Sequence, residues 1–526
     1  MRFLFILFSM LTIFSCLQKN RSTSVAVVPR DTTITPDVSF TQLLLDSNVV
    51  ESFINEQAHE KDLDTKIRNF YNSRNYQYAW FDEDGITEQA QAFWTLHQAD
   101  DDKMVDSSLL NRDLHTTMNI LLNESDTSFS ASDQQKTELR LTLHFLIYLN
   151  TAFNGKVQPD EMQWHIPRRK IDEVAMLDSF LNSRTTEWKP LNEHFYRLEN
   201  KMKEYVAIAK KGEWDAIETQ KKKLRRGETD SVVGLVKKRL QLSGDYDPAD
   251  SSLLFNDSLQ NVIKKLQRSF GQQPSGIIDN SLLKELNIPV SERIKQMKIN
   301  LERMRWMPEQ SKERLIANIP EYKLHVFENN ERVMSMDIVV GKEANRTVIF
   351  SDMLKYVVFS PYWNVPRSIV RSEIIPAMNK SSNYLQRNNM EITGQSNGLP
   401  IVRQKPGKGN ALGKVKFIFP NRYNIYFHDT PAKTLFEKQK RAFSHGCIRI
   451  QQPFEMAKYL LKNDSAWTDD KINKAMNQAR EKWVELKKPV PVFIVYFTSW
   501  VDREGLLHFR EDIYGHDERM EKHLFE

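Results

Sequence analysis

The chain has 526 residues, of which 27% are charged and 40% hydrophobic, and its formal net charge at pH 7 is +5. This length is too great for one hydrophobic core, and about 150 residues per domain predicts roughly three domains. The hydrophobic content excludes a disordered protein. The mild, well-mixed basic charge gives no specific case for nucleic acid as a partner. Two cysteines exclude a disulfide framework.

The N-terminus is typical of an export signal. A basic residue precedes an apolar run over residues 3–14, which is too short to span a bilayer as a mature helix. Residues 13–16 (IFSC) resemble a bacterial lipobox, in which the cysteine becomes the lipidated first residue. We therefore expect a lipoprotein signal peptide over 1–16 with Cys16 as the lipidation site; an ordinary secretory signal or an uncleaved anchor is the alternative. Residues 17–38, polar and rich in Ser and Thr, predict a flexible tether.

Helical periodicity dominates residues 39–230, which we expect to form an all-α scaffold domain followed by a charged connector. The longest apolar stripe covers residues 134–153. The aromatic residues of this region are at positions typical of packing, so we assign it no chemistry.

Three shorter helices are expected over residues 231–288, separated by glycines. This layout, with the helix segment LQRSFG, the turn at 276–279 (GIID) and a closing LLKELN helix, resembles the three-helix peptidoglycan-binding domain. A spacer without binding activity is the alternative. Residues 289–312 are expected to be a linker helix.

From residue 313 to 515 the hydrophobic period changes to two, which predicts a β-rich domain. Its strands are expected at 315–319, 322–327, 333–340, 356–359, 415–419, 424–427 and 492–497. A long insert at about 367–412 starts with a helical stretch and ends in a Gly-rich loop, which is typical of a lid. Residues 516–526 are expected to be a tail.

Cys447 is expected to be the only free thiol of the mature chain, and it follows His445 and Gly446. A thiol of ordinary pKa, about 8.5, is only slightly ionised at neutral pH, so a nucleophilic cysteine needs a histidine that accepts its proton or stabilises its thiolate. Gly446 permits unusual backbone angles beside the thiol, and nearby N–H groups could face an oxyanion. His428 follows the strand expected at 424–427 and could meet Cys447 from an adjacent strand. We therefore expect His428 to be the base and His445 to contact the substrate or the oxyanion.

His428, followed after 15 residues by Ser444-His445-Gly446-Cys447-Ile448-Arg449, resembles the signature of the YkuD-type L,D-transpeptidases. The resemblance extends to the stretches YWNVP, RQKPG, NALGKVKF and IYFHDTP, starting at residues 362, 403, 410 and 425. It points to the large, multidomain periplasmic branch of the family. The fold it implies is α+β and multidomain: an all-α scaffold, a three-helix peptidoglycan-binding domain, and a β-rich YkuD-like catalytic domain at 313–515 with a helical, capping lid insert.

The resemblance also implies a reaction. Cys447 would attack the bond between the third residue, a diamino acid, and the terminal D-Ala of a tetrapeptide stem, forming a thioester. The side-chain amine of another stem would then give a 3→3 cross-link. His428 would act as base, oriented by the backbone carbonyl of Asp429, and the amides of Gly446 and Cys447 would line the oxyanion hole. No cofactor and no metal are implied.

The remaining site residues come from the same resemblance. Arg449 would help to bind the stem, and Ser444 would shape the loop. Tyr426 and Trp363 would line the substrate groove, with core packing as the alternative for both. The partners implied are donor and acceptor stem peptides, and a membrane reached through the lipid anchor. The implied location is the bacterial cell envelope, facing the periplasm.

Several other functions remain open from the sequence. Cys447, His445 and His428 could supply three zinc ligands, but their spacing does not match the usual ligand loops, and no paired-carboxylate pattern indicates glycoside hydrolysis. Water as acceptor would give an L,D-carboxypeptidase, and a protein amine would give a lipoprotein-attaching enzyme. A non-catalytic peptidoglycan-binding lipoprotein is the alternative outside the enzymes.

Overall fold

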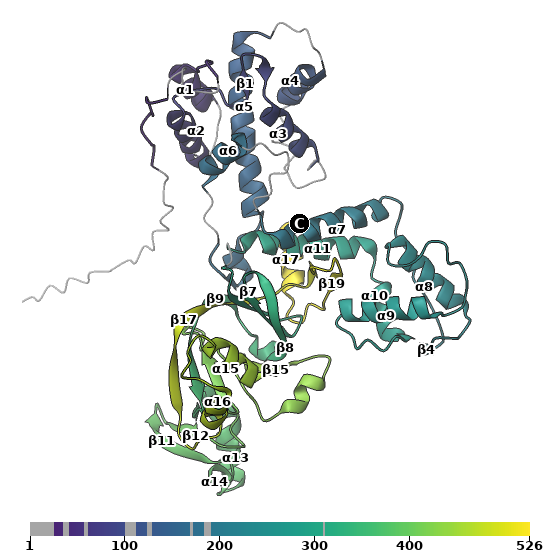
Figure 1. Cartoon of the computed structure of the whole chain (residues 1–526), viewed down its shortest axis with the longest axis vertical. Coiled ribbons are helices and arrows are strands. Elements are labelled where there is room, and N and C mark those ends of the chain that lie inside the picture. Colours follow the sequence, from purple (N-terminus) through teal and green to yellow (C-terminus); the bar gives the residue numbers. More distant parts are fainter. Residues whose placement is uncertain are drawn as a thin grey trace, which may run out of the picture. The chain divides into compact units, whose positions relative to one another are not determined.

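The structure is a computed structural model (Figure 1), and it describes residues 26–34, 41–56, 61–99, 112–123, 129–168, 172–182, 191–308 and 311–525. The expected signal peptide, Cys16 and most of the expected tether lie outside these residues. The chain forms two compact units, residues 1–151 with 171–188, and residues 152–170 with 189–526. No helix in the described ranges is long and apolar enough to cross a membrane.

The first unit is helical, as the periodicity predicts. Its elements are α1 (Ser47–Glu56), α2 (Lys61–Ser73), β1 (Phe81–Asp82), β2 (Gly85–Ile86), α3 (Glu88–Ala99), α4 (Arg112–Asn123), α5 (Ala131–Leu149) and α6 (Glu173–Leu181). The apolar stripe expected over 134–153 forms α5, whose side chains are largely buried, and a π-helical turn, Asn150–Asn154, follows it.

A buried carboxylate organises the centre of this unit. Glu138 on α5 accepts hydrogen bonds from the backbone N–H of Ala79 (2.6 Å) and of Trp80 (2.9 Å), and from the hydroxyl of Tyr71 (3.0 Å). Burial raises the pKa of Glu138 to about 7, although these bonds oppose the shift. The contacts connect α5 to α2 and to the turn before β1, which fits a structural role.

Three helices and a β-hairpin pack together in the second unit. They are α7 (Glu193–Ala209), α11 (Val290–Trp306), β18 (Ser499–Val501), β19 (Leu507–Phe509) and α17 (His516–Phe525). The expected linker helix is α11, and it is mostly buried because it packs against α7 and α17. The expected tail is α17, whose Met520 is buried and whose Asp517 pairs with Arg303 at 2.5 Å. Because α7 belongs to the second unit, the boundary between the two compact units falls before residue 230, the expected end of the scaffold domain and its connector.

The region expected to hold three helices contains α8 (Ser231–Leu242), α9 (Asp257–Ser269) and α10 (Asn280–Leu286). Asp230, Asn256 and Asp279 cap the three N-termini through their side chains. A separate apolar cluster holds the helices together, and the short strands β4 (Lys223–Leu224) and β5 (Ile278–Asp279) pair beside it. The helices are therefore present, while peptidoglycan binding by them stays a prediction.

The β-rich domain is built on one large sheet. Its strands are β3 (Trp164–His165), β6 (Arg314–Asn318), β7 (Lys323–Glu328), β8 (Glu331–Gly341), β9 (Ile349–Phe359), β13 (Val415–Ile418), β14 (Phe427–His428), β15 (Ala442–Ser444), β16 (Ile448–Ile450) and β17 (Lys482–Val495). They are ordered β13-β14-β16-β8-β7-β6-β17-β9-β3, with β15 beside β8, and a further pairing of β9 with β13 closes the sheet on itself. The strand expected at 424–427 starts only at Phe427, because Asn424 has a left-handed φ of 55°.

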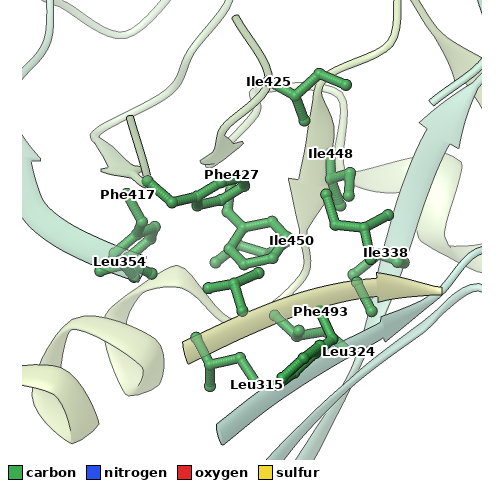
Figure 2. Packing of buried hydrophobic residues seen from close by; sticks show 14 of the residues in the cluster. Leu315, Leu324, Ile338, Leu354, Phe417, Ile425, Phe427, Ile448, Ile450 and Phe493 are labelled. Carbon is green, nitrogen blue, oxygen red and sulfur yellow. The ribbon is translucent and has the colours of Figure 1, made fainter. Parts of the chain in front are cut away.

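Alternate residues of these strands fill a common core. Figure 2 shows Phe427, Ile448 and Ile450 facing Leu315 and Phe493 from the opposite strands. The helices α15 (Pro453–Leu461) and α16 (Asp469–Met476) contribute to the same cluster. Since period-two alternation directs the neighbours of core residues to the other face, Tyr426, His428, Cys447 and Arg449 share the outer face.

The insert has its own small core. It contains α12 (Arg367–Ile369), α13 (Ile375–Lys380), α14 (Tyr384–Arg387), β11 (Met390–Ser396) and β12 (Leu399–Gln404), and β10 (Trp363–Asn364) lies just before it. The three strands pair in the order β10-β12-β11. Trp363 is partly buried and packs against this cluster of Val365, Ile369, Val370, Ile374 and Val402, which fits the alternative of core packing. Its expected place in the substrate groove stays a prediction.

Candidate active site

The motif residues meet where two short parallel strands lie side by side. In β14 and β16, Phe427 pairs with Ile448 and His428 with Arg449. One step back along each strand, Tyr426 and Cys447 occupy neighbouring positions on the outer face. The rings of Tyr426 and His428 lie 5.7 Å apart. Cys447 and His428 are thus diagonal neighbours across the strand pair.

The thiol of Cys447 is half-buried and hydrogen-bonded. Its sulfur donates to the backbone carbonyl of Asn424 at 3.5 Å. The left-handed backbone of Asn424, with a φ of 55°, is part of the bend that precedes β14. The hydroxyl of Tyr426 lies within hydrogen-bonding reach of the same sulfur. Asn424 is a site residue that the motif did not reveal.

One ring nitrogen of His428 has a fixed partner. Nδ1 lies 2.5 Å from the backbone carbonyl oxygen of Asp429, so it carries the proton and leaves Nε2 as the basic nitrogen. The Asp429 carboxylate accepts from the N–H of Lys414 (2.8 Å) and from the ammonium of Lys433 (2.6 Å). Gly413 leaves room for that carboxylate, since a Cβ there would lie 2.4 Å from its Cγ. These contacts position the carbonyl that orients His428.

Both reacting groups are neutral at rest. Burial, and then the positive charge of Arg449, lower the pKa of His428 to about 3. Burial raises the pKa of Cys447, although Tyr426 and Arg449 oppose the shift. Of the two ways in which a histidine activates a thiol, this environment favours proton acceptance during attack over a stored thiolate–imidazolium pair.

The loop before Cys447 is closed by three hydrogen bonds. The Ser444 hydroxyl donates to the carbonyl of Cys447 (2.5 Å) and accepts from the N–H of Gly446 (3.1 Å). The hydroxyl of Thr347 donates to the carbonyl of Gly446 at 2.8 Å. Gly446 has a φ of +114°, which L side chains rarely adopt.

This loop changes the expectation for the oxyanion hole. The Gly446 amide, expected to stabilise the oxyanion, already donates to Ser444. The backbone N–H of Cys447 makes no hydrogen bond to another described residue. Cys447 N–H is therefore the donor that this geometry leaves for a developing negative charge.

Arg449 is a half-buried cation on the outer face, between His428 on β14 and Val339 on β8. Its Nε is buried and has no hydrogen-bond partner among the described residues. Since a buried, unsatisfied guanidinium donor is costly, an anionic ligand at this position would be stabilised.

His445 is exposed and contacts the insert. Its Nε2 lies 3.0 Å from Oε1 of Glu373, which belongs to the π-helical turn Val370–Ile374. The two side chains are 41% and 52% exposed. The contact links the motif to the insert, and the substrate or oxyanion contact expected for His445 stays a prediction.

The arrangement does not resemble a metal site. In the part of the chain that the structure describes, no group of three or more His, Cys, Asp or Glu side chains lies close enough to hold a metal ion. Nε2 of His445, one of the three zinc ligands considered from the sequence, is paired with Glu373.

Comparisons with known proteins cover the region that contains this site. Residues 312–490 match the YkuD family, described as an L,D-transpeptidase catalytic domain, and residues 65–211 match a family described as a scaffold domain. The chain contains a YkuD-type L,D-transpeptidase catalytic domain. A putative L,D-transpeptidase of Haemophilus influenzae is 30% identical over 252 residues, 44% of this chain. The match spans about half of that relative, 51% of its length. The family resemblance and the mixed α+β organisation are thereby confirmed.

Solved structures of L,D-transpeptidases are also similar to parts of the chain. One from Mycobacterium smegmatis matches at 13% identity and a TM-score of 0.19, over 35% of this chain and 58% of its own. One from Stackebrandtia nassauensis matches at 12% identity and a TM-score of 0.22, over 53% of this chain and 97% of its own. Because these scores are low, the assignment of the transpeptidase domain rests on the family match and on the curated relative.

Proposed function

We propose that the protein is a peptidoglycan L,D-transpeptidase that forms 3→3 cross-links through a thioester on Cys447. The observation that carries the proposal is the outer face of β14 and β16. There a neutral thiol, a neutral histidine with one nitrogen bonded to a carbonyl, and an arginine whose Nε has no partner among the described residues lie together. These groups match the needs of acyl transfer from a carboxylate-bearing peptide.

In the acylation step, Nε2 of His428 takes the thiol proton as Sγ of Cys447 attacks the carbonyl carbon of the third stem residue. The oxyanion accepts a hydrogen bond from the backbone N–H of Cys447. When the intermediate collapses, the C–N bond to D-Ala breaks and His428 returns the proton to the departing amine. The products are a thioester and free D-Ala. The hydrogen bond from the thiol to the Asn424 carbonyl has to break first, since the thiol has a single proton to donate.

In the second step, an acceptor amine gives its proton to His428 and attacks the thioester carbon. The C–S bond breaks, and the proton passes to the sulfur. The lowered pKa keeps the imidazole of His428 unprotonated throughout the neutral range, so that it is free to accept a proton in either step.

The charge of the insert supports an anionic substrate. Residues 367–412 contain seven Lys and Arg against two Glu, a formal charge of +5, which equals the net charge of the whole chain. Arg371, Lys380 and Lys408 are exposed there. Since stem peptides carry several carboxylates, this cationic insert favours their capture, and its contact through Glu373 supports its role as a lid.

The regions outside the catalytic domain complete the proposal. The three helices at 231–288 would bind peptidoglycan, and the scaffold region would support the enzyme. The N-terminus, through Cys16, would anchor it to a membrane of the cell envelope on the periplasmic side. The resemblance of these segments to a binding domain and to a lipobox is the support for both statements.

The test is mass spectrometry of tetrapeptide muropeptides incubated with the full chain in detergent, with Cys447→Ala as control. We expect a dimer that has lost one D-Ala and is linked 3→3, absent with the variant. Tripeptide without dimer would mean a carboxypeptidase. No product from either protein, with the thiol still reactive, would favour a protein acceptor or the non-catalytic alternative.

A further inference from the structure

A row of paired residues crosses the outer face of the sheet from the active site on β16 to the start of β17. The pairings of β16, β14, β13, β9 and β17 align Arg449 with His428, His428 with Lys416, Lys416 with Val358, and Val358 with Trp483. Directly paired residues point to the same face, so Trp483 lies on the face that carries Cys447. The mechanism above gives Trp483 no role.

Trp483 is exposed but held in one orientation. Its side chain is 53% exposed, an unusual state for so large an aromatic group. Nε1 donates to the carboxylate of Glu481 at 2.8 Å. The ammonium of Lys416 lies 5.3 Å from the ring centroid, and the ring of Tyr356 packs edge-on at 5.9 Å. The indole is thus a fixed apolar surface that borders water.

A pyranose ring has the chemistry that fits such a surface. The axial C–H groups of a sugar form an apolar, weakly positive face, and the face of an indole is apolar and negative. Stacking removes both surfaces from water without separating a sugar hydroxyl from its solvent. The proposed substrate is a glycan that carries stem peptides, so sugars are present wherever a stem enters the site.

The distance to the thiol matches the length of a stem. Four steps between adjacent strands, at about 4.8 Å each, separate β16 from β17 along the sheet, about 19 Å in all. Three extended residues between the sugar and the scissile carbonyl span about 11 Å. The linking group and the ring itself add several ångströms, which brings the sugar over Trp483. Arg449 lies along this path, where stem carboxylates would pass, and Lys416 next to it is paired with Glu481 at 3.5 Å.

We infer that Trp483 is the platform of a sugar subsite, which stacks on a pyranose of the glycan strand whose stem occupies the active site. The inference rests on the proposed function, since it requires that the donor stem reaches Cys447. It adds a specificity: the enzyme prefers donors that are still attached to sugar over free stem peptides.

The experiment compares two donors, the free tetrapeptide and the disaccharide tetrapeptide, on the full chain in detergent. Intact-mass spectrometry gives the rate of thioester formation on Cys447 with each. The readout is the ratio of the two rates, which cancels any general loss of active protein. For the wild type we expect the disaccharide donor to react roughly tenfold faster, from the apolar area that one stacked ring buries.

Three variants test whether the ratio of the two rates depends on the aromatic face of Trp483. Trp483→Ala is expected to lower it to about one, and Trp483→Phe to retain most of it, because a phenyl ring still offers a stacking face. Phe525→Ala, which removes a 41% exposed aromatic from α17, is the matched control and keeps the wild-type ratio.

A wild-type ratio near one, or an unchanged ratio in Trp483→Ala, overturns the sugar subsite. Equal losses with both donors in Trp483→Ala leave the ratio unchanged and also overturn it, since they indicate a structural role. No thioester from either donor in the wild type contradicts the proposed function itself, and the sugar subsite with it.

Discussion

Strands β14 and β16 lie on a core of 44 described residues that are buried together, whereas the insert beside them has a buried cluster of five. The sheet presents Cys447 and His428 on a surface that packing fixes from below. The insert carries the excess positive charge and meets the motif through one half-exposed contact, His445 with Glu373. The proposed reacting groups are therefore on the sheet, which has the large core. The charges proposed to attract substrate are on the insert, which has the small one.

The largest difference between these regions is chemical. His428→Gln is expected to lower the rate of thioester formation by about 10³, because it removes the base while the fold is kept. Rapid-quench mass spectrometry with a tetrapeptide donor measures the rate, and circular dichroism checks the fold. A loss below tenfold would assign the proton transfer to another group.

Stability provides the second comparison, through the same substitution in each region. Ile450→Ala in the main core is expected to cost about 4 kcal/mol, and Ile374→Ala in the insert about 2 kcal/mol, because the smaller cluster relaxes around the cavity. Both isoleucines are buried, at 0% and 2% exposure. Urea unfolding followed by tryptophan fluorescence measures the two changes. Equal costs would contradict the difference in packing.

The pH dependence of thiol reactivity tests whether Cys447 and His428 are both neutral at rest. With the pKa of Cys447 raised by burial, the thiolate fraction at pH 7 is small, and the rate of alkylation by iodoacetamide should rise steadily with pH beyond 9. With the pKa of His428 lowered to about 3, the base stays unprotonated as pH falls, so thioester formation should change little between pH 5 and 8. An alkylation plateau that begins below pH 7 would indicate a stored ion pair instead.

The smallest expected effect concerns the contact between motif and insert. Glu373→Gln weakens the pair with His445, and an exposed pair of this kind contributes at most about 1 kcal/mol, so access to the thiol should rise no more than about fivefold. Alkylation by a bulky maleimide measures that access. Glu391→Gln is the matched control, since Glu391 pairs with Arg403 inside the insert. Equal effects of the two variants would show that the contact with His445 does not restrain the insert.

Much of this organisation could be predicted from the sequence. Period-two patterns located most strands of the catalytic domain, and glycine breaks located α8, α9 and α10, because core-facing alternation and turn chemistry are local. The motif spacing identified the transpeptidase domain for a similar reason: the chemistry requires those residue types on two adjacent strands.

The remaining features depend on contacts between distant segments. The occupied Gly446 amide follows from a Ser444 rotamer, and the partner of His445 comes from Glu373, about 70 positions away. The burial of α11 and the helical end of the chain, α17, depend on each other, since Arg303 pairs with Asp517 across more than 200 residues. No local pattern contains such information. Trp483 was overlooked because a lone tryptophan on a strand is usually read as core.

The most direct test of the account is to trap the acyl-enzyme. Full-length protein mixed with a tetrapeptide donor, quenched in acid within its first turnover and digested, should give a Cys447 peptide heavier by the donor minus one D-Ala. The adduct should be removed by hydroxylamine, as expected of a thioester, and be absent from Cys447→Ala. Cross-linked product without any such adduct, or an adduct on another residue, would contradict the central role of Cys447.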